Sequence, residues 1–138
     1  MKHCETFEHT ADVGLSARAD TLGELLEALA EGLADLICPR ENVEAREKKD
    51  LRVEAEDVEA MTVDFLSDVL SLMEADRFAV AACRVGWAHE TAVAAEFRGE
   101  PLDPDRHEIG TEVKAVTYHG LQVARDGDAW TARVLLDI

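Results

Sequence analysis

Apolar residues recur along this chain with two periods, and the longer period predicts a helix in the first third of the sequence. Leucine and isoleucine side chains recur at helical spacing between Leu22 and Ile37, at Leu22, Leu25, Leu26, Leu29, Leu33, Leu36 and Ile37. This spacing places them on one face of an α-helix. Thr21 and Glu24 form a capping box, in which each side chain accepts a hydrogen bond from a backbone N–H group at the helix start. Pro39 then ends the run.

The same period returns after Asp57 and predicts a second helix that runs to about Met73. Asp57 is a good N-cap because its carboxylate can accept a hydrogen bond from the first turn. The apolar positions of this helix lie on one broad face, and they are Val58, Met61, Phe65, Leu66, Val69, Leu70, Leu72 and Met73.

A strict alternation of apolar and polar residues predicts half-buried strands elsewhere. The predicted strands are residues 13–19, 51–55, 78–86, 91–98, 112–118, 121–125 and 130–137. Residues 41–50 are polar and predict a connecting loop, and residues 99–104 have the proline and acidic composition of a turn. Asp126-Gly127-Asp128 predicts a hairpin between the last two strands.

Two helices and six or seven strands, many of them in hairpins, predict an α+β fold. The economical arrangement has two layers, with one antiparallel or mixed sheet covered by both helices. The sequence has no internal repeat, no low-complexity segment and no change of composition that marks a boundary. We therefore expect residues 1–138 to form a single domain.

The chain is strongly acidic, which narrows the classes of partner. Its 14 Lys and Arg against 30 Asp and Glu give a net charge of −16. Such a surface repels phosphate backbones, so strong direct binding of nucleic acid is not expected. A basic protein partner suits it, and an acidic face that serves solubility alone is an equal alternative. No apolar run approaches the ~20 residues of a membrane span, and no signal-peptide core follows Met1, so we expect a cytoplasmic protein without a membrane partner.

Three cysteines, Cys4, Cys38 and Cys83, stand far apart and include no C-x-x-C pair. An odd number of isolated thiols fits neither a disulfide framework nor a zinc site. Buried and unreactive thiols are the expected state, because free cysteine is among the most buried residue types.

Oxygen-bearing residues gather near Asp12 and at the other end of the sequence, where Asp137 precedes the α-carboxylate of Ile138. Hard cations such as calcium prefer oxygen ligands of this kind. The structural alternatives are a turn-forming role for Asp12 and a frayed end at Asp137 and Ile138. An amphipathic strand that reaches Asp137 argues against fraying. Gly14 interrupts the first predicted strand, and a close approach by backbone or ligand is one reason for such a glycine.

Lys114, His9 and His119 are further candidates. Lys114 is one of four lysines and lies in a predicted strand of mostly uncharged residues. There it could pair with a carboxylate, reach a phosphate or simply point into solvent. Each histidine could act in acid–base chemistry or serve as a hydrogen-bonded structural residue. The chain has no Gly-rich phosphate loop, nucleophile elbow or H-E-x-x-H motif, so support for an enzyme is slight.

Several segments together resemble the archease family. They are residues 7–14 (FEHTADVG), 21–25 (TLGEL), 53–57 (VEAED), 112–119 (EVKAVTYH) and 134–138 (VLLDI). They occur in the family's order and close to its spacing over nearly the whole chain. One departure is Phe65, where the family pattern leads us to expect Trp; an aromatic residue is kept.

The resemblance implies an α+β accessory protein that activates the tRNA-splicing RNA ligase. Such a protein promotes guanylylation of the ligase and its repeated turnover, and has no catalytic residues of its own. The family also implies a divalent metal, seen as calcium, at positions that correspond here to Asp12, Asp137 and Ile138. Lys114 matches the family lysine linked to activation, and His9 and His119 would be supporting residues.

Two other functions stay open from the sequence. One is a self-sufficient metal-dependent phosphoesterase that uses Asp12, Asp137, His9 and His119. The other is a chaperone-like interaction module in which no metal takes part. Phosphoesterase activity without a ligase would favour the first. Unchanged metal binding and activity after Asp12→Ala would favour the second.

Overall fold

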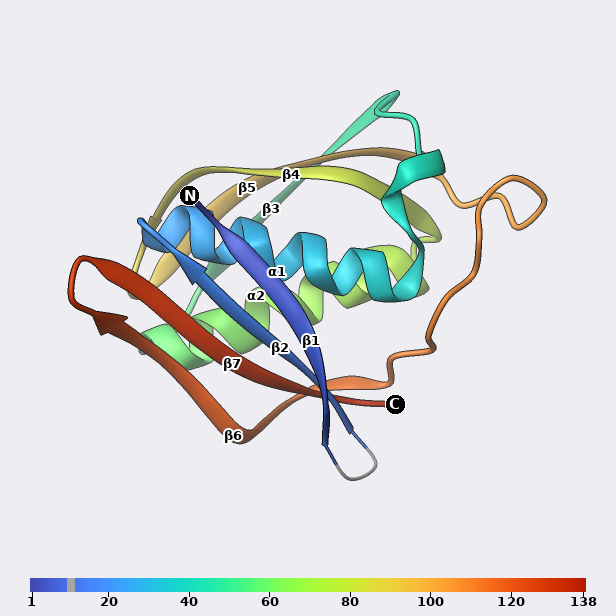
Figure 1. The fold of residues 1–138 in the computed structure, drawn as a ribbon. Coiled ribbons are helices and arrows are strands. Elements are labelled where there is room, and N and C mark those ends of the chain that lie inside the picture. The colour runs from blue at the N-terminus through green and yellow to red at the C-terminus, as the bar shows by residue number, and fades with distance from the viewer. Residues whose placement is uncertain (10–11) are drawn as a thin grey trace.

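The computed structural model describes residues 1–9 and 12–138, and its two long helices lie between two β-sheets (Figure 1). Sheet A has the order β1-β2-β7-β6, and its strands are β1 (His3–His9), β2 (Asp12–Ala19), β7 (Ala129–Asp137) and β6 (Ala115–Asp126). Sheet B has the order β3-β5-β4, with β3 (Glu47–Glu54), β5 (Ala92–Pro101) and β4 (Phe78–His89). The helices are α1 (Leu22–Ile37) and α2 (Val58–Glu74), and a short 3-10 helix, η1, spans Arg40–Asn42.

The α+β class with two long helices and seven strands is confirmed, but the strands form two antiparallel sheets rather than one. The reason lies in the helices, whose buried residues cover more than one face. In α1 the buried set includes Leu22, Leu25, Ala28 and Ala30. A helix buried on two sides needs an apolar layer on each of them, so a single sheet could not cover both.

Both predicted helix starts are confirmed by their caps. The Thr21 hydroxyl accepts a hydrogen bond from the Glu24 backbone N–H at 3.1 Å. The Asp57 carboxylate accepts one from the Ala60 N–H at 2.8 Å. These caps satisfy N–H groups that have no partner within the helix. Within residues 1–9 and 12–138, neither helix combines the length and apolar composition that a membrane span requires.

The strands differ from the sequence expectation in several places. β5 continues to Pro101, inside the predicted turn of residues 99–104. β1 was not predicted, because its exposed positions break the apolar alternation of a strand at the sheet edge. β3 begins at Glu47, inside the predicted loop of residues 41–50. β6 joins the predicted strands 112–118 and 121–125 into one strand from Ala115, with an irregular register between Thr117 and Gln122. Residues 112–114 precede that strand.

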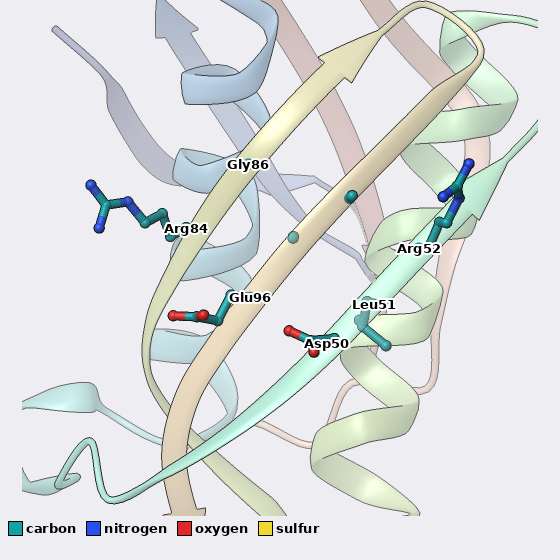
Figure 2. A pocket seen from close by; sticks show the side chains of 8 residues that line it. Asp50, Leu51, Arg52, Arg84, Gly86 and Glu96 are labelled. Carbon is teal, nitrogen blue, oxygen red and sulfur yellow. The ribbon is translucent and has the colours of Figure 1, made fainter.

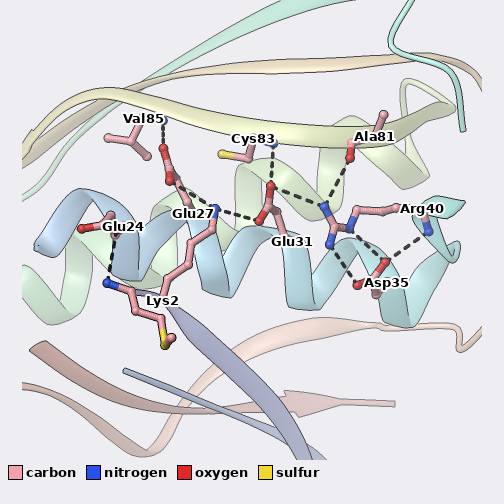
Figure 3. Close-up of polar contacts among 10 residues, drawn as sticks. Lys2, Glu24, Glu27, Glu31, Asp35, Arg40, Ala81, Cys83 and Val85 are labelled. Atoms are coloured by element: carbon pink, nitrogen blue, oxygen red, sulfur yellow. Dashed lines mark hydrogen bonds and ion pairs between the residues drawn. The ribbon is translucent and has the colours of Figure 1, made fainter. Parts of the chain in front are cut away.

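One edge of sheet B, strand β4, is closed by carboxylates of α1 (Figure 3). Glu27 accepts a hydrogen bond from the Val85 N–H at 2.7 Å, and Glu31 accepts one from the Cys83 N–H at 3.2 Å. Lys2 lies between the two carboxylates, at 3.2 and 2.9 Å. An edge strand with unpaired N–H groups invites pairing with another chain. These carboxylates occupy N–H groups that a further strand would need.

A buried carboxylate joins the two loops beside sheet B. Glu100 accepts a hydrogen bond from the Glu44 backbone N–H at 2.7 Å, and the Arg106 guanidinium also donates to it. His107 accepts at Nδ1 from the Asp103 N–H at 2.9 Å. Its Nε2 therefore carries the proton and donates to Glu100 at 3.0 Å. The Glu44 N–H, followed by His107 and Arg106, lowers the pKa of Glu100 from 4.5 to about 2.

This cluster predicts a loss of stability in acid. A carboxyl group whose pKa is lower in the folded state stabilises the fold above its unfolded pKa, and that contribution disappears as pH falls through the folded pKa. For Glu100 the window runs from about pH 4.5 down to about pH 2. We expect Glu100→Gln to be less stable than the wild type at pH 7, with the difference shrinking across this window. Urea unfolding at pH 7, 4.5 and 2.5 measures it, and a constant difference would contradict the assignment.

Candidate functional site

The register of sheet A places Asp12 directly opposite Asp137. The two are Cα partners in the antiparallel β2–β7 pair. The row continues outward, because His9 pairs with Asp12 on one side and Ala115 pairs with Asp137 on the other. Side chains at directly opposed positions share a face, with Cβ atoms about 4.5–5.5 Å apart. Residues from opposite ends of the sequence therefore meet in one row across all four strands.

This row belongs to the outer face of sheet A, away from the helices. Leu15 and Ala17 of β2, and Val134 and Leu136 of β7, are buried against the helices. Because side chains alternate between the faces of a strand, Asp12 lies on the opposite side from this core. We call the Asp12, Asp137 and Ile138 positions, with Lys114 beside them, the carboxylate row.

Lys114 and Ile138 adjoin the two aspartates. The Lys114 backbone N–H donates to the Asp137 carbonyl oxygen at 2.7 Å, just before β6 begins. Ile138 follows Asp137 and is 38% exposed, at the C-terminus that Figure 1 shows where β7 ends. A strand paired on both sides up to Asp137 holds this end of the chain in place. The α-carboxylate thus lies one residue beyond Asp137, which is the cross-strand partner of Asp12.

The structure describes the two candidate histidines to different extents. Thr10 and Ala11 of the first motif, and the imidazole of His9, lie outside what the structure describes; the His9 backbone is at the end of β1. His119 is exposed and lies in the irregular part of β6, four residues beyond the row. The structure therefore brings Asp12, Asp137, Ile138 and Lys114 to one end of sheet A, and His119 to a neighbouring segment.

The oxygen atoms of the carboxylate row are the kind of ligand that a hard cation prefers, and they would fill part of its coordination shell. Two carboxylates directly opposite each other repel, and a divalent ion removes that repulsion. Among the described residues, however, no three His, Cys, Asp or Glu side chains are grouped closely enough to hold a metal ion. Calcium takes ~6–8 oxygen ligands. Asp12, Asp137 and the Ile138 carboxylate would be its anionic ligands, and other oxygens would have to complete the shell.

Gly14 has the close approach that the sequence suggested, and the approaching group is Phe7 of the same motif. A Cβ atom at Gly14 would lie 2.0 Å from Phe7 Cζ. The Phe7 ring therefore lies against the β2 backbone, on the same face as the carboxylate row. The Arg133 guanidinium lies over this ring, 4.2 Å from its centroid. The sequence motif contains Phe7 but does not indicate its contact with Gly14, and no sequence pattern indicates Arg133; both contacts become visible only once the register is known.

A separate hollow of about 370 Å³ lies on the outer face of sheet B (Figure 2). Its lining includes Asp50, Arg52, Arg84, Gly86, Ala94 and Glu96. Two arginines and two carboxylates surround a floor of small residues, so the hollow favours neither sign of charge. The helices separate this sheet from sheet A, and the hollow is not part of the carboxylate row.

The three cysteines are free, as expected, and two of them are buried. Burial raises the pKa of the Cys4 thiol to about 11 and also raises the pKa of Cys83. A thiol with a raised pKa is a poor nucleophile and a poor metal ligand near neutral pH. The cysteines therefore add no reactive group to the site.

Comparison with known proteins gives consistent similarities over the whole chain. The model of the archease protein family (MTH1598/TM1083) matches residues 4–138. The protein archease of Pyrococcus abyssi is 35% identical over 144 residues, and all of each chain is covered. Protein archease of Thermococcus kodakarensis is 37% identical over 142 residues, again with full coverage of both chains.

Two solved structures share the fold. Protein 1598 of Methanobacterium thermoautotrophicum has a TM-score of 0.81 at 26% identity, with 98% of each chain covered. A Thermotoga maritima protein, described as an archease and possible chaperone, has a TM-score of 0.62 at 26% identity. In that comparison 97% of this chain and 96% of the other are covered.

Proposed function

This chain belongs to the archease family, and from that premise we propose that it activates the tRNA-splicing RNA ligase as an accessory protein. In this proposal it promotes guanylylation of the ligase and repeated rounds of RNA joining. The nucleophile and the covalent chemistry belong to the ligase. This chain contributes binding, charge and a bound cation.

The observation that supports the proposal most directly is the opposition of Asp12 and Asp137 in one row. Facing carboxylates on the outer side of a sheet destabilise the free protein. A cation removes that cost and adds a binding function. The residues that the family resemblance indicated for metal binding lie far apart in sequence, and the register of β2 and β7 supports their use as one site.

The cation is proposed to be calcium or another divalent ion, held by Asp12, Asp137 and the Ile138 carboxylate. When bound, it would supply positive charge at the surface that faces the ligase. Lys114, next to Asp137 through its backbone hydrogen bond, would supply a second positive charge there. An activator of this kind must bind one state of the ligase more tightly than another, because equal affinity for both states shifts nothing.

The test counts RNA joining events per ligase molecule, with GTP and metal present, with and without this protein. We expect the count to rise well above one only when the protein is present. Lys114→Ala should lower the activation at least tenfold. The matched control is Lys49→Ala, an exposed lysine on β3 of sheet B. If the ligase from the same organism shows no increase, or if both lysine variants behave alike, the proposal fails.

A chaperone-like role is the second candidate, since the Thermotoga maritima relative is described as a possible chaperone. In that role the protein would keep its partner folded and would not change each guanylylation event. Measuring the guanylylated fraction of a pre-folded ligase separates the two functions. An increase within one turnover supports activation, whereas only slower ligase inactivation supports the chaperone.

A further inference from the structure

A polar hollow of about 410 Å³ lies on the outer face of sheet A, the same face that carries the carboxylate row. Two adjacent rows of the sheet line it. Glu5, Ser16, Arg133 and Gln122 form one row, and His3, Arg18 and Thr131 form the other. The hollow is thus built on regular strands rather than on loops, which gives its side chains well-defined positions.

Arg133 is held at this hollow by a stack of groups. Gly14 has no side chain, so the Phe7 ring lies on the β2 backbone, and the Arg133 guanidinium covers the ring at 4.2 Å. Stacking of this kind restrains the planar guanidinium on the ring. Among the described residues, no carboxylate forms an ion pair with Arg133. It is an oriented cation without an anionic partner.

The other charged residues of the lining are one arginine and one carboxylate. Arg18 forms an ion pair with Asp126 at 2.7 Å. Glu5, the carboxylate of the lining, lies 3.4 Å from the His3 ring. The lining itself contains two arginines and one carboxylate, so its formal charge is positive with His3 neutral, on a protein whose net charge is −16. An anion fits this lining.

Uncharged donors extend the site beyond the arginine. The hydroxyl group of Ser16 and the amide of Gln122 line the same hollow, whereas the Thr131 hydroxyl there donates to the Ala124 carbonyl oxygen at 3.4 Å. Guanidinium, hydroxyl and amide groups that approach from three strands suit an anion with several oxygens directed to different sides. A phosphate group has this shape, and Arg binds it with two parallel hydrogen bonds. A single carboxylate would use only part of the set.

The hollow and the carboxylate row lie close enough to contact one partner surface. Arg133 and Asp137 are four residues apart on β7 and point to the same face, which separates them by about 13 Å. Between them lies the row that contains Phe7, Gly14 and Leu135. One face of sheet A therefore presents a cation site and an anion site together.

We propose that this hollow, centred on Arg133, binds the phosphate of a nucleotide unit. The ligand class is a terminal phosphate group, as in a free nucleotide or at the 3′ end of an RNA strand. The choice of an RNA end rests on the proposed function, whereas the binding of phosphate does not. Because the overall charge repels long polyanions, a single terminal phosphate is favoured over an extended strand.

The test is direct binding to the full chain, without ligase, at low ionic strength. The probes are GTP and a short labelled RNA prepared with either a 3′-phosphate or a 3′-hydroxyl end. We expect the 3′-phosphate RNA to bind at least tenfold more tightly than the 3′-hydroxyl RNA. Arg133→Ala should remove this preference, and Arg133→Lys should keep part of it, because lysine retains the charge but not the planar fork. Added salt should weaken binding.

The matched control is Arg125→Ala, which removes an arginine stacked on Trp130 at 5.5 Å, outside this hollow. Circular dichroism checks folding, and Ser16→Ala replaces Arg133→Ala if the latter does not fold. GTP binding that depends on Arg133, with no preference between RNA ends, would support the phosphate site with a free nucleotide as its source. No binding of either probe, or equal losses in the Arg133 and Arg125 variants, would overturn it. Since no ligase is present, failure here is distinct from failure of the activation test.

Discussion

Asp137→Asn should abolish the stabilisation of this protein by calcium. A ligand that binds only the folded state at 100 times its Kd stabilises it by about 2.7 kcal/mol. For a chain of this length that corresponds to a rise in Tm of roughly 10 °C. The substitution keeps the shape of the side chain but removes one of two facing carboxylates. Thermal unfolding with calcium and with a chelator measures the change.

The same variant should behave in the opposite way without a cation. Like charges directly opposite each other across two strands are destabilising by up to ~1 kcal/mol. In chelator we therefore expect Asp137→Asn to be at least as stable as the wild type, while in calcium it should be clearly less stable. Asp137→Asn would thus be at least as stable as the wild type in chelator and less stable in calcium. A cation site predicts this reversal, whereas an aspartate that only forms a turn or lies in a frayed end does not.

Asp126→Asn is the matched control, because Asp126 is an exposed carboxylate at the other end of sheet A and pairs with Arg18. Its response to calcium should equal that of the wild type. In the ligase assay, Asp137→Asn and Asp12→Asn should each lose most of the activation, while Asp126→Asn should keep it. Equal calcium responses of the wild type and Asp137→Asn would remove the metal from the proposed function.

Gly14→Ala should destabilise the fold by about 1–3 kcal/mol, the range for inserting a methyl group into filled space. The new Cβ would lie 2.0 Å from Phe7 Cζ and 2.2 Å from Phe7 Cε1. The ring must then leave the β2 backbone, and Arg133 loses the surface that supports it. Alanine restricts the unfolded chain more than glycine, which offsets ~0.4–1 kcal/mol, but the clash is the larger effect.

Urea unfolding of Gly14→Ala, Phe7→Leu and the double variant measures this coupling. Because the two sites are in contact, we expect the double variant to be ~1 kcal/mol more stable than the sum of the single effects implies. Gly86→Ala is the control, since its added Cβ would meet nothing closer than the Ala94 carbonyl oxygen at 3.7 Å. Additive effects at Gly14 and Phe7 would show that the ring is free to move aside.

Local patterns in the sequence were sufficient for the helices of this protein. Each helix has a complete apolar period and a capping residue directly before its first residue, Thr21 or Asp57. Each cap binds a backbone N–H group three residues further along the chain. These are interactions between near neighbours, so their spacing is visible in the chain. The hairpin at Asp126 and Gly127 followed for the same reason, and Gly127 has the positive φ of 63° that such a turn requires.

The division into two sheets depended on contacts that no local pattern contains. A strand shows which of its faces is apolar, but not which strand will pair with it. β1 escaped detection because an edge strand need not alternate, and β6 was read as two strands because its register is irregular in the middle. The number of strands agrees only because these two differences cancel, and the assignment of the strands to layers was not accessible from the sequence.

By itself the sequence determined an acidic α+β chain with two capped amphipathic helices, and it singled out Asp12, Lys114, Asp137 and Ile138 as chemically suitable residues. Only the tertiary structure decided that Asp12 and Asp137 face each other and that Arg133 covers Phe7. The physical reason is register: a shift of one residue between β2 and β7 would send every side chain to the other face. That register is set by the burial of Leu15, Val134 and Leu136 against the helices, and the site follows from the packing of the core.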